Sequence, residues 1–91
     1  MKLLDVIKNI NKFSEEDTIY AVEPWSALSE TIVLHDENGK LPKEAREKGM
    51  TYFLEIFIAK EFLEDLQSVT KQNMSIEESC NRIIEYALKD A

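Results

Sequence analysis

Residues 2–13 place an apolar side chain at every third or fourth position, with charged or polar residues between them. This spacing is typical of a helix that packs one apolar face on a core and exposes the other face to water. The pattern therefore predicts a first amphipathic helix over residues 2–13. Its apolar residues are Leu3, Val6, Ile7, Ile10 and Phe13.

Two short stretches rich in β-branched and aromatic residues follow, at residues 18–23 and 31–35. Side chains of these types favour extended backbone, so each stretch predicts a strand. Pro24 has no backbone N–H to donate to a sheet, and residues 24–29 are therefore expected to form a turn or irregular link. The second stretch ends at the turn-forming residues 36–39, and the two strands are predicted to pair as antiparallel neighbours.

Residues 42–48 predict a short helix, since Pro42 suits a first helical turn and Gly49 suits the position just after a helix end. Residues 51–58 are the most strongly β-type stretch and predict a central or well-covered strand. Because side chains alternate along a strand, the stretch is expected to have two distinct sides. One side carries Tyr52, Leu54, Ile56 and Ile58, and the other carries Phe53, Glu55 and Phe57.

Two further helices are predicted in the last third of the chain. Between residues 59 and 69 the apolar residues again recur every three or four positions. Ser75 and Glu78 have the spacing of a capping box, in which the serine hydroxyl accepts a hydrogen bond from a backbone N–H of the first turn. The last helix then presents one apolar face, made of Ile76, Cys80, Ile83, Ile84, Ala87 and Leu88.

The predicted elements follow one another as helix, strand, strand, short helix, strand, helix, helix. That order suits an α+β fold, with a small antiparallel sheet of about three strands and helices packed on one face. Ninety-one residues suffice for one hydrophobic core and leave no room for a second. Residues 1–91 are therefore expected to form a single domain.

Composition predicts a protein of the cytoplasm. Asp5 and Lys8 interrupt the first apolar residues before a signal-peptide core can form, so no export is expected. The apolar run 50–59 is too short to span a bilayer and contains Glu55. Cys80 is the only cysteine, which excludes an intramolecular disulfide and suits a reducing compartment.

The residues that could carry catalysis are few. One histidine and one cysteine cannot supply a zinc or redox-metal cluster, and no phosphate-binding, dinucleotide or nucleophile-elbow motif is present. His35 beside Asp36 is interpreted as a structural residue at a strand end, and Cys80 as a core thiol. Glu55 should either emerge on a solvated sheet face or lie half-buried with a cationic partner. We expect no catalytic residue, no cofactor and no metal, although an enzyme using Glu55 with His35 is kept as a third hypothesis.

Charge is the informative signal. The formal net charge is −7, which disfavours nucleic acid and membrane surfaces as partners. Residues 14–39 contain no Lys or Arg, so the uncompensated charge is concentrated on the first two predicted strands and their loops. The acidic residues of this segment are Glu15, Glu16, Asp17, Glu23, Glu30, Asp36 and Glu37.

Two interpretations of this acidic segment stay open. In one, carboxylates steer a basic protein toward a surface that also presents aromatic anchors. In the other, the segment is a solvated hairpin whose charge aids solubility and whose tryptophan is part of the core. The first interpretation predicts a partner-binding surface made of Asp17, Tyr20, Glu23, Trp25, Asp36 and Glu37.

Residues 23–58 resemble a family of small uncharacterised bacterial proteins, and the likeness implies a shared fold without catalytic residues. The matching positions are Pro24-Trp25, Ser29, Val33-Leu34, Leu41-Pro42, Glu44-Ala45, Gly49 and Tyr52-Phe53-Leu54-Glu55-Ile56. In size, acidity and lack of a catalytic motif the chain is also similar to immunity proteins of bacterial contact-dependent toxin systems. That similarity implies an inhibitor that occludes a toxin domain, often a nuclease with a basic active site.

The resulting hypothesis is a non-catalytic binding protein of the immunity type that neutralises a basic toxin partner. Its alternative is a structural or oligomerising protein. In that case residues 51–58 or the last helix would form a homodimer face through apolar burial.

Overall fold

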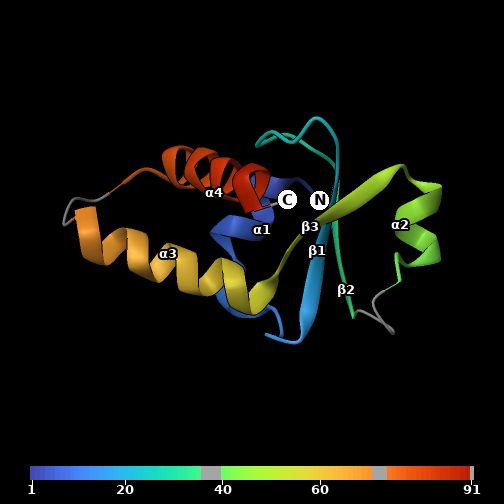
Figure 1. Cartoon of the computed structure of the whole chain (residues 1–91), viewed down its shortest axis with the longest axis horizontal. Coiled ribbons are helices and arrows are strands. Elements are labelled where there is room, and N and C mark those ends of the chain that lie inside the picture. The colour runs from blue at the N-terminus through green and yellow to red at the C-terminus, as the bar shows by residue number, and fades with distance from the viewer. Residues whose placement is uncertain (36–39, 71–73, 91) are drawn as a thin grey trace.

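The computed structural model describes residues 1–35, 40–70 and 74–90, and these contain a three-stranded antiparallel sheet with helices (Figure 1). The α+β fold class predicted from the sequence is therefore confirmed. In chain order the elements are α1 (Leu3–Lys8), the 3-10 helix η1 (Ile10–Lys12), β1 (Asp17–Val22), β2 (Thr31–His35), α2 (Lys43–Glu47), β3 (Met50–Glu55), α3 (Ile56–Thr70) and α4 (Ile76–Asp90).

The strand order of the sheet is β2-β1-β3, so β1 lies in the middle and pairs antiparallel with both neighbours. The antiparallel pairing of the first two strands was predicted and is confirmed. The strand predicted over residues 51–58 as central or well-covered is an edge strand and not a central one, and it ends at Glu55, although Met50, Phe53 and Leu54 are buried in the two core clusters. From Ile56 the chain continues directly as α3, three residues before the helical period becomes visible in the sequence.

A β-bulge in β3 changes which of its side chains enter the core. Ile19 lies opposite Leu54, but the next residue of β1, Tyr20, lies opposite Tyr52, so Phe53 is an extra residue on β3. A bulge of this kind breaks the strict alternation of side chains. Phe53 and Leu54 are each 1% exposed and pack in the same cluster, so the prediction that they face opposite sides is wrong.

The main core lies between the sheet and the helices α1, α3 and α4, which lie on the same side of the strands in Figure 1. A fully buried side chain of this apolar type contributes about 1.5–3 kcal/mol through removal from water. Cys80 is completely buried in this core, as the sequence predicted. The buried residues of the cluster are Leu3, Val6, Ile7, Ile10, Ile19, Phe53, Leu54, Ile56, Ala59, Cys80, Ile83, Ile84 and Ala87.

The short helix α2 lies on the opposite face of the sheet (Figure 1). There Ala45 packs with Tyr20 and Met50 in a second buried cluster, flanked by partly buried apolar residues of β1 and β2. The sequence predicted helices on one face, and α1, α3 and α4 follow that prediction. The five-residue α2 is the exception, and it gives β1 a covered face on both sides.

Local signals fix several helix ends. Gly49, just beyond α2, has a φ of 70°, a left-handed conformation that favours glycine. Ser75 Oγ accepts a hydrogen bond of 3.1 Å from the backbone N–H of Glu78 at the start of α4. The first helix is shorter than predicted, since α1 ends at Lys8 and a 3-10 turn follows.

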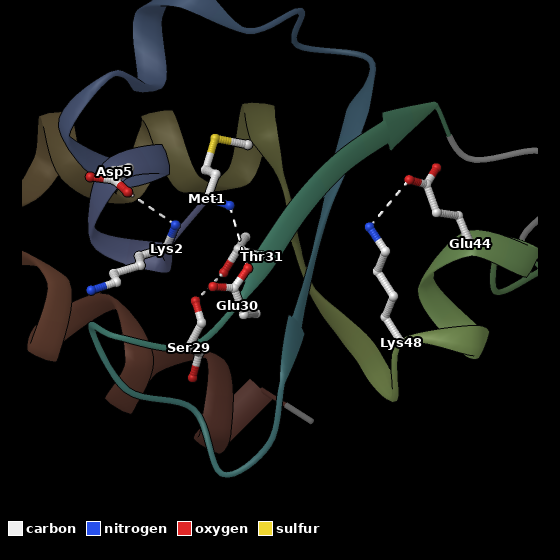
Figure 2. Close-up of polar contacts among 8 residues, drawn as sticks. All are labelled: Met1, Lys2, Asp5, Ser29, Glu30, Thr31, Glu44 and Lys48. Carbon is white, nitrogen blue, oxygen red and sulfur yellow. Dashed lines mark hydrogen bonds and ion pairs between the residues drawn. The ribbon is translucent and has the colours of Figure 1, made fainter.

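The first residues of the chain lie along the start of β2 (Figure 2). The N–H of Thr31 donates to the carbonyl of Met1 at 2.7 Å, and the N–H of Leu3 donates to the carbonyl of Ser29 at 2.9 Å. The Met1 amino group also lies 3.5 Å from a Glu30 carboxylate oxygen. These bonds cover part of the β2 edge, which would otherwise expose unpaired backbone groups.

Candidate functional site: an acidic groove at one end of the sheet

The start of β1 and the ends of β2 and β3 meet at one end of the sheet. Antiparallel pairing places Asp17 opposite His35, and Thr18 opposite Glu55. An open groove of about 870 Å³ lies at this end, and we call it the acidic groove. It is lined by Glu15, Glu16, Thr18, His35, Glu55, Phe57, Lys60, Glu61 and Glu64.

One wall of the acidic groove is a single face of α3. Phe57, Glu61 and Glu64 follow one another at intervals of four and three positions, with Lys60 beside them, and such residues lie on the same side of a helix. Because α3 begins directly after β3, its first two turns stand next to the strand ends (Figure 1). Glu15 and Glu16, in the turn before β1, also line the groove.

Five of the nine lining residues are glutamates, and only one is a lysine. Lys60 Nζ lies 3.9 Å from a carboxylate oxygen of Glu15 and donates a 3.3 Å hydrogen bond to the carbonyl of Phe13. Its side chain is only 16% exposed, so this cation is held in place by the protein itself. Within residues 1–35, 40–70 and 74–90, the other four glutamates form no ion pair: Glu16, Glu55, Glu61 and Glu64.

Glu55 combines features of the two environments predicted for it. It is half-buried at the end of β3, yet it has no cationic partner in the described part of the chain. Its carboxylate therefore lines the groove with its charge uncompensated by a neighbouring side chain. A cation that enters the groove gains from this charge because the surrounding protein screens it less than bulk water does.

Thr18 adds an unsatisfied hydroxyl to the same groove. Thr18 is 1% exposed, and its Oγ1 is buried without a hydrogen-bond partner among the described residues. Residues directly opposite each other in a sheet project to the same face, so Thr18 projects to the side of Glu55, which also lines the groove. An unsatisfied buried hydroxyl costs about 1–3 kcal/mol, and a ligand that bonds to it would recover part of that free energy.

His35 lies at the rim of the groove, next to Asp17. Its Nδ1 is 3.8 Å from an Asp17 carboxylate oxygen, and its side chain is 65% exposed. That distance exceeds the roughly 2.6–3.2 Å over which a carboxylate orients a catalytic imidazole. Glu55 and His35, the two residues of the enzyme hypothesis, line the same groove.

The structure divides the partner-binding surface predicted from the sequence. Asp17 begins β1 beside the groove, whereas Glu23 and Trp25 follow the other end of this strand. Six residues of extended chain separate the two ends by roughly 20 Å. Asp36 and Glu37 lie outside the described residues. Of the predicted residues that the structure describes, only Asp17 lies next to the acidic groove, through its contact with His35 at the rim.

The two predicted aromatic anchors are mainly packing residues. Tyr20 is 2% exposed in the cluster under α2, so the prediction that it is presented on the surface is wrong. Trp25 is half-buried against the main core, where its ring meets Phe53, and its Nε1 is buried without a partner among the described residues. Glu23 is exposed and accepts a 2.7 Å hydrogen bond from Thr51 Oγ1.

The residues that complete the groove were not singled out as a site in the sequence. Glu61 and Glu64 read as the ordinary polar face of a helix, and Phe57 was assigned to a strand. Phe57, Glu61 and Glu64 lie on one helix face only because α3 begins at residue 56, earlier than the sequence predicted. The one available signal was Glu55, an acidic residue inside the most apolar stretch of the chain.

Two classes of site receive no support from the described part of the chain. No group of three or more His, Cys, Asp or Glu residues there is arranged to hold a metal ion. None of the helices in residues 1–35, 40–70 and 74–90 has both the length and the apolar character needed to cross a membrane. The glutamates of the groove are therefore considered as ligands for a larger cationic group.

Comparison of the chain with family models, with curated proteins and with solved structures found no match in any of the three.

Proposed function

We propose that this is a non-catalytic binding protein, of the immunity type, that neutralises a basic partner protein by docking it over the acidic groove. The observation that carries the proposal is the gathering of Glu16, Glu55, Glu61 and Glu64 in one open groove without ion-pair partners in the described chain. Charges arranged in this way accelerate the encounter with a basic partner and favour it over acidic competitors.

The net charge supports a protein partner over a nucleic acid. A chain with a formal charge of −7 and an acidic groove repels phosphate groups. A protein that itself binds phosphates, such as a toxin nuclease domain, presents the complementary basic surface. In that interaction the carboxylates of the groove would occupy positions that the nucleic-acid phosphates otherwise fill.

The proposal is tested by reversing charge inside and outside the groove. A partner captured from the native lysate and identified by mass spectrometry is titrated with the wild type and with a Glu61→Lys, Glu64→Lys double variant. The matched control is Glu77→Lys, Glu85→Lys, which makes the same charge change on exposed positions of α4. We expect the groove variant to slow association at least about tenfold more than the control, with a weaker dependence on salt. Equal effects of the two variants would show that the groove is not the docking site.

One observation favours the alternative of a self-associating protein. The edge strand β3 carries Tyr52, which is 47% exposed, on the margin of the sheet. Edge strands of this kind can pair with a second copy of the same chain. Light scattering over a dilution series distinguishes the hypotheses, because a protein that pairs through β3 would scatter as a dimer at high concentration, would dissociate on dilution, and would stay monomeric in Tyr52→Lys.

A further inference from the structure

The acidic groove contains three kinds of unused binding capacity. Four glutamates lack an ion-pair partner in the described chain, Thr18 Oγ1 lacks a hydrogen-bond partner there, and Phe57 is 42% exposed on the groove wall. The carboxylates attract positive charge, the hydroxyl requires a hydrogen-bonding group, and the ring offers a flat apolar face. A single ligand that uses all three must be a cation with several donors and a planar apolar surface.

Donor number and shape separate the cationic groups of proteins. An ionised carboxylate only accepts hydrogen bonds, so the best ligand is one that donates many. A lysine ammonium is a compact point charge with three donors, whereas an arginine guanidinium is a planar fork with five. Four carboxylates around one open groove therefore suit arginine better than lysine, since the fork can reach two acceptors at once.

The position of Phe57 strengthens this preference. Phe57 and Glu61 are four residues apart on α3, so the ring and the carboxylate project from adjacent turns of the same helix face. Guanidinium groups stack on aromatic rings while donating in their own plane to carboxylates. An ammonium is more strongly hydrated and gains less from the same ring.

We propose that the acidic groove is a subsite for an arginine side chain of the basic partner. In this arrangement the guanidinium stacks on Phe57 and donates to the carboxylates of Glu55 and Glu61, with Thr18 Oγ1 below them as a further acceptor. The proposal rests on the proposed function, because it names the chemical group that the acidic groove takes from its partner.

The test uses three labelled peptides of identical length with alternating glycine, in which the other positions are all arginine, all lysine or all citrulline. Affinity for the full-length protein is measured by fluorescence anisotropy at low salt, and amide shifts in nitrogen-15 NMR spectra locate the binding. We expect the arginine peptide to bind about threefold to fivefold more tightly than the lysine peptide, and the neutral citrulline peptide not to bind. The largest shifts are expected for Glu55, Phe57 and Glu61.

Two variants separate stacking from charge. Phe57→Leu keeps an apolar side chain and should bring the arginine and lysine peptides to within about twofold of each other. Its control is Tyr52→Leu, which removes an exposed aromatic residue that does not line the groove. Glu61→Gln should weaken both cationic peptides, whereas Glu77→Gln on α4 should weaken neither. Circular dichroism confirms that each variant is folded.

The possible failures are distinguishable. If arginine and lysine peptides bind equally and Phe57→Leu has no effect, the arginine subsite is wrong, even if Glu61→Gln shows that the groove binds cations. If no peptide binds at the groove, the subsite is also wrong. The wider proposal fails separately, when affinity for the identified protein partner does not respond to charge reversal in the groove.

Discussion

The indole ring of Trp25 meets the ring of Phe53 edge to face, with ring centroids 4.9 Å apart and planes at 84°. Phe53 is the extra residue of the β3 bulge and is 1% exposed, whereas Trp25 belongs to the link between β1 and β2. Aromatic pairs in this geometry contribute about 0.5–1.5 kcal/mol beyond the area that they bury. The contact therefore fastens a connecting loop to the main core.

Removal of the Trp25 ring should destabilise the protein. We expect Trp25→Ala to lower the free energy of unfolding by about 2–4 kcal/mol, since it removes both packing and the ring pair. Trp25→Phe keeps an aromatic side chain and should cost about 1 kcal/mol. Urea unfolding followed by circular dichroism measures both values. An unchanged free energy in Trp25→Ala would mean that the indole serves a surface role, as the anchor interpretation of the sequence proposed.

Gly49 offers a test of backbone conformation without steric interference. Its φ is 70°, and a Cβ atom added there would find nothing within 4 Å. Any loss of stability in Gly49→Ala therefore comes from the left-handed conformation, which costs a residue with a Cβ about 1–2 kcal/mol. Gly49→Asn should cost less, because asparagine tolerates this region better. Equal stability of alanine and glycine at this position would contradict the assigned conformation.

Cys80 predicts a specific loss of stability at alkaline pH. Burial raises the pKa of the Cys80 thiol from its ordinary value of 9.0 to about 11. The folded protein thus holds the thiol proton more tightly than the unfolded chain does. The stabilising contribution is complete below about pH 9, declines between about pH 9 and 11, and is lost as the pH rises through about 11.

The measurement compares the wild type with Cys80→Ala by urea unfolding at about pH 8 and about pH 10.5. Tyrosine and lysine titrations are common to both proteins and cancel in the difference. We expect the stability advantage of the wild type over the variant to shrink at the higher pH. A constant difference would indicate that the thiol ionises equally well in the folded and unfolded chain.

Thr18 should trade stability against binding. Thr18→Val replaces a buried hydroxyl, unpaired among the described residues, with a methyl group of the same shape. We expect the free energy of unfolding to stay the same or to rise by about 1–2 kcal/mol, and affinity for an arginine peptide to fall. Thr18→Ser keeps the hydroxyl and should retain more of the affinity. A marked destabilisation by valine would show that the hydroxyl is satisfied within the protein.

Local sequence signals predicted the parts of the fold that depend on local chemistry. β2 has the predicted bounds, 31–35, and Gly49 and Ser75 mark helix ends as expected. The boundary between β3 and α3 was missed because residues 56–58 carry apolar and β-branched side chains that suit either structure. The register of β1 with β3 ends at the pair Thr18–Glu55, and residues 56–58, which have no partner on β1, form the first turn of α3.

The site was less predictable because charge was counted along the chain and not across the folded surface. The acidic segment 14–39 contributes Glu15 and Glu16 to the groove and Asp17 to its rim, but the other carboxylates come from residues about 40 positions later. Tyr20 was misassigned because a middle strand covered on both faces has no exposed side. Neither the gathering of carboxylates that are distant in sequence nor the burial of Tyr20 can be predicted from a short stretch of the chain.

The bulge at Phe53 has a consequence for how the groove could change over time. The bulge shifts the register of β3 against β1 just before the chain enters α3, and a bulge re-aims the side chains that follow it, so it contributes to which side chains of the helix face the strand ends. The direction that this wall of the groove faces thus depends on the hydrogen-bond pattern of the sheet and not on which side chains the wall carries. Substitutions on α3 could retune the groove toward a different partner while its shape persists, whereas deletion of a single residue at the bulge would turn the whole wall away.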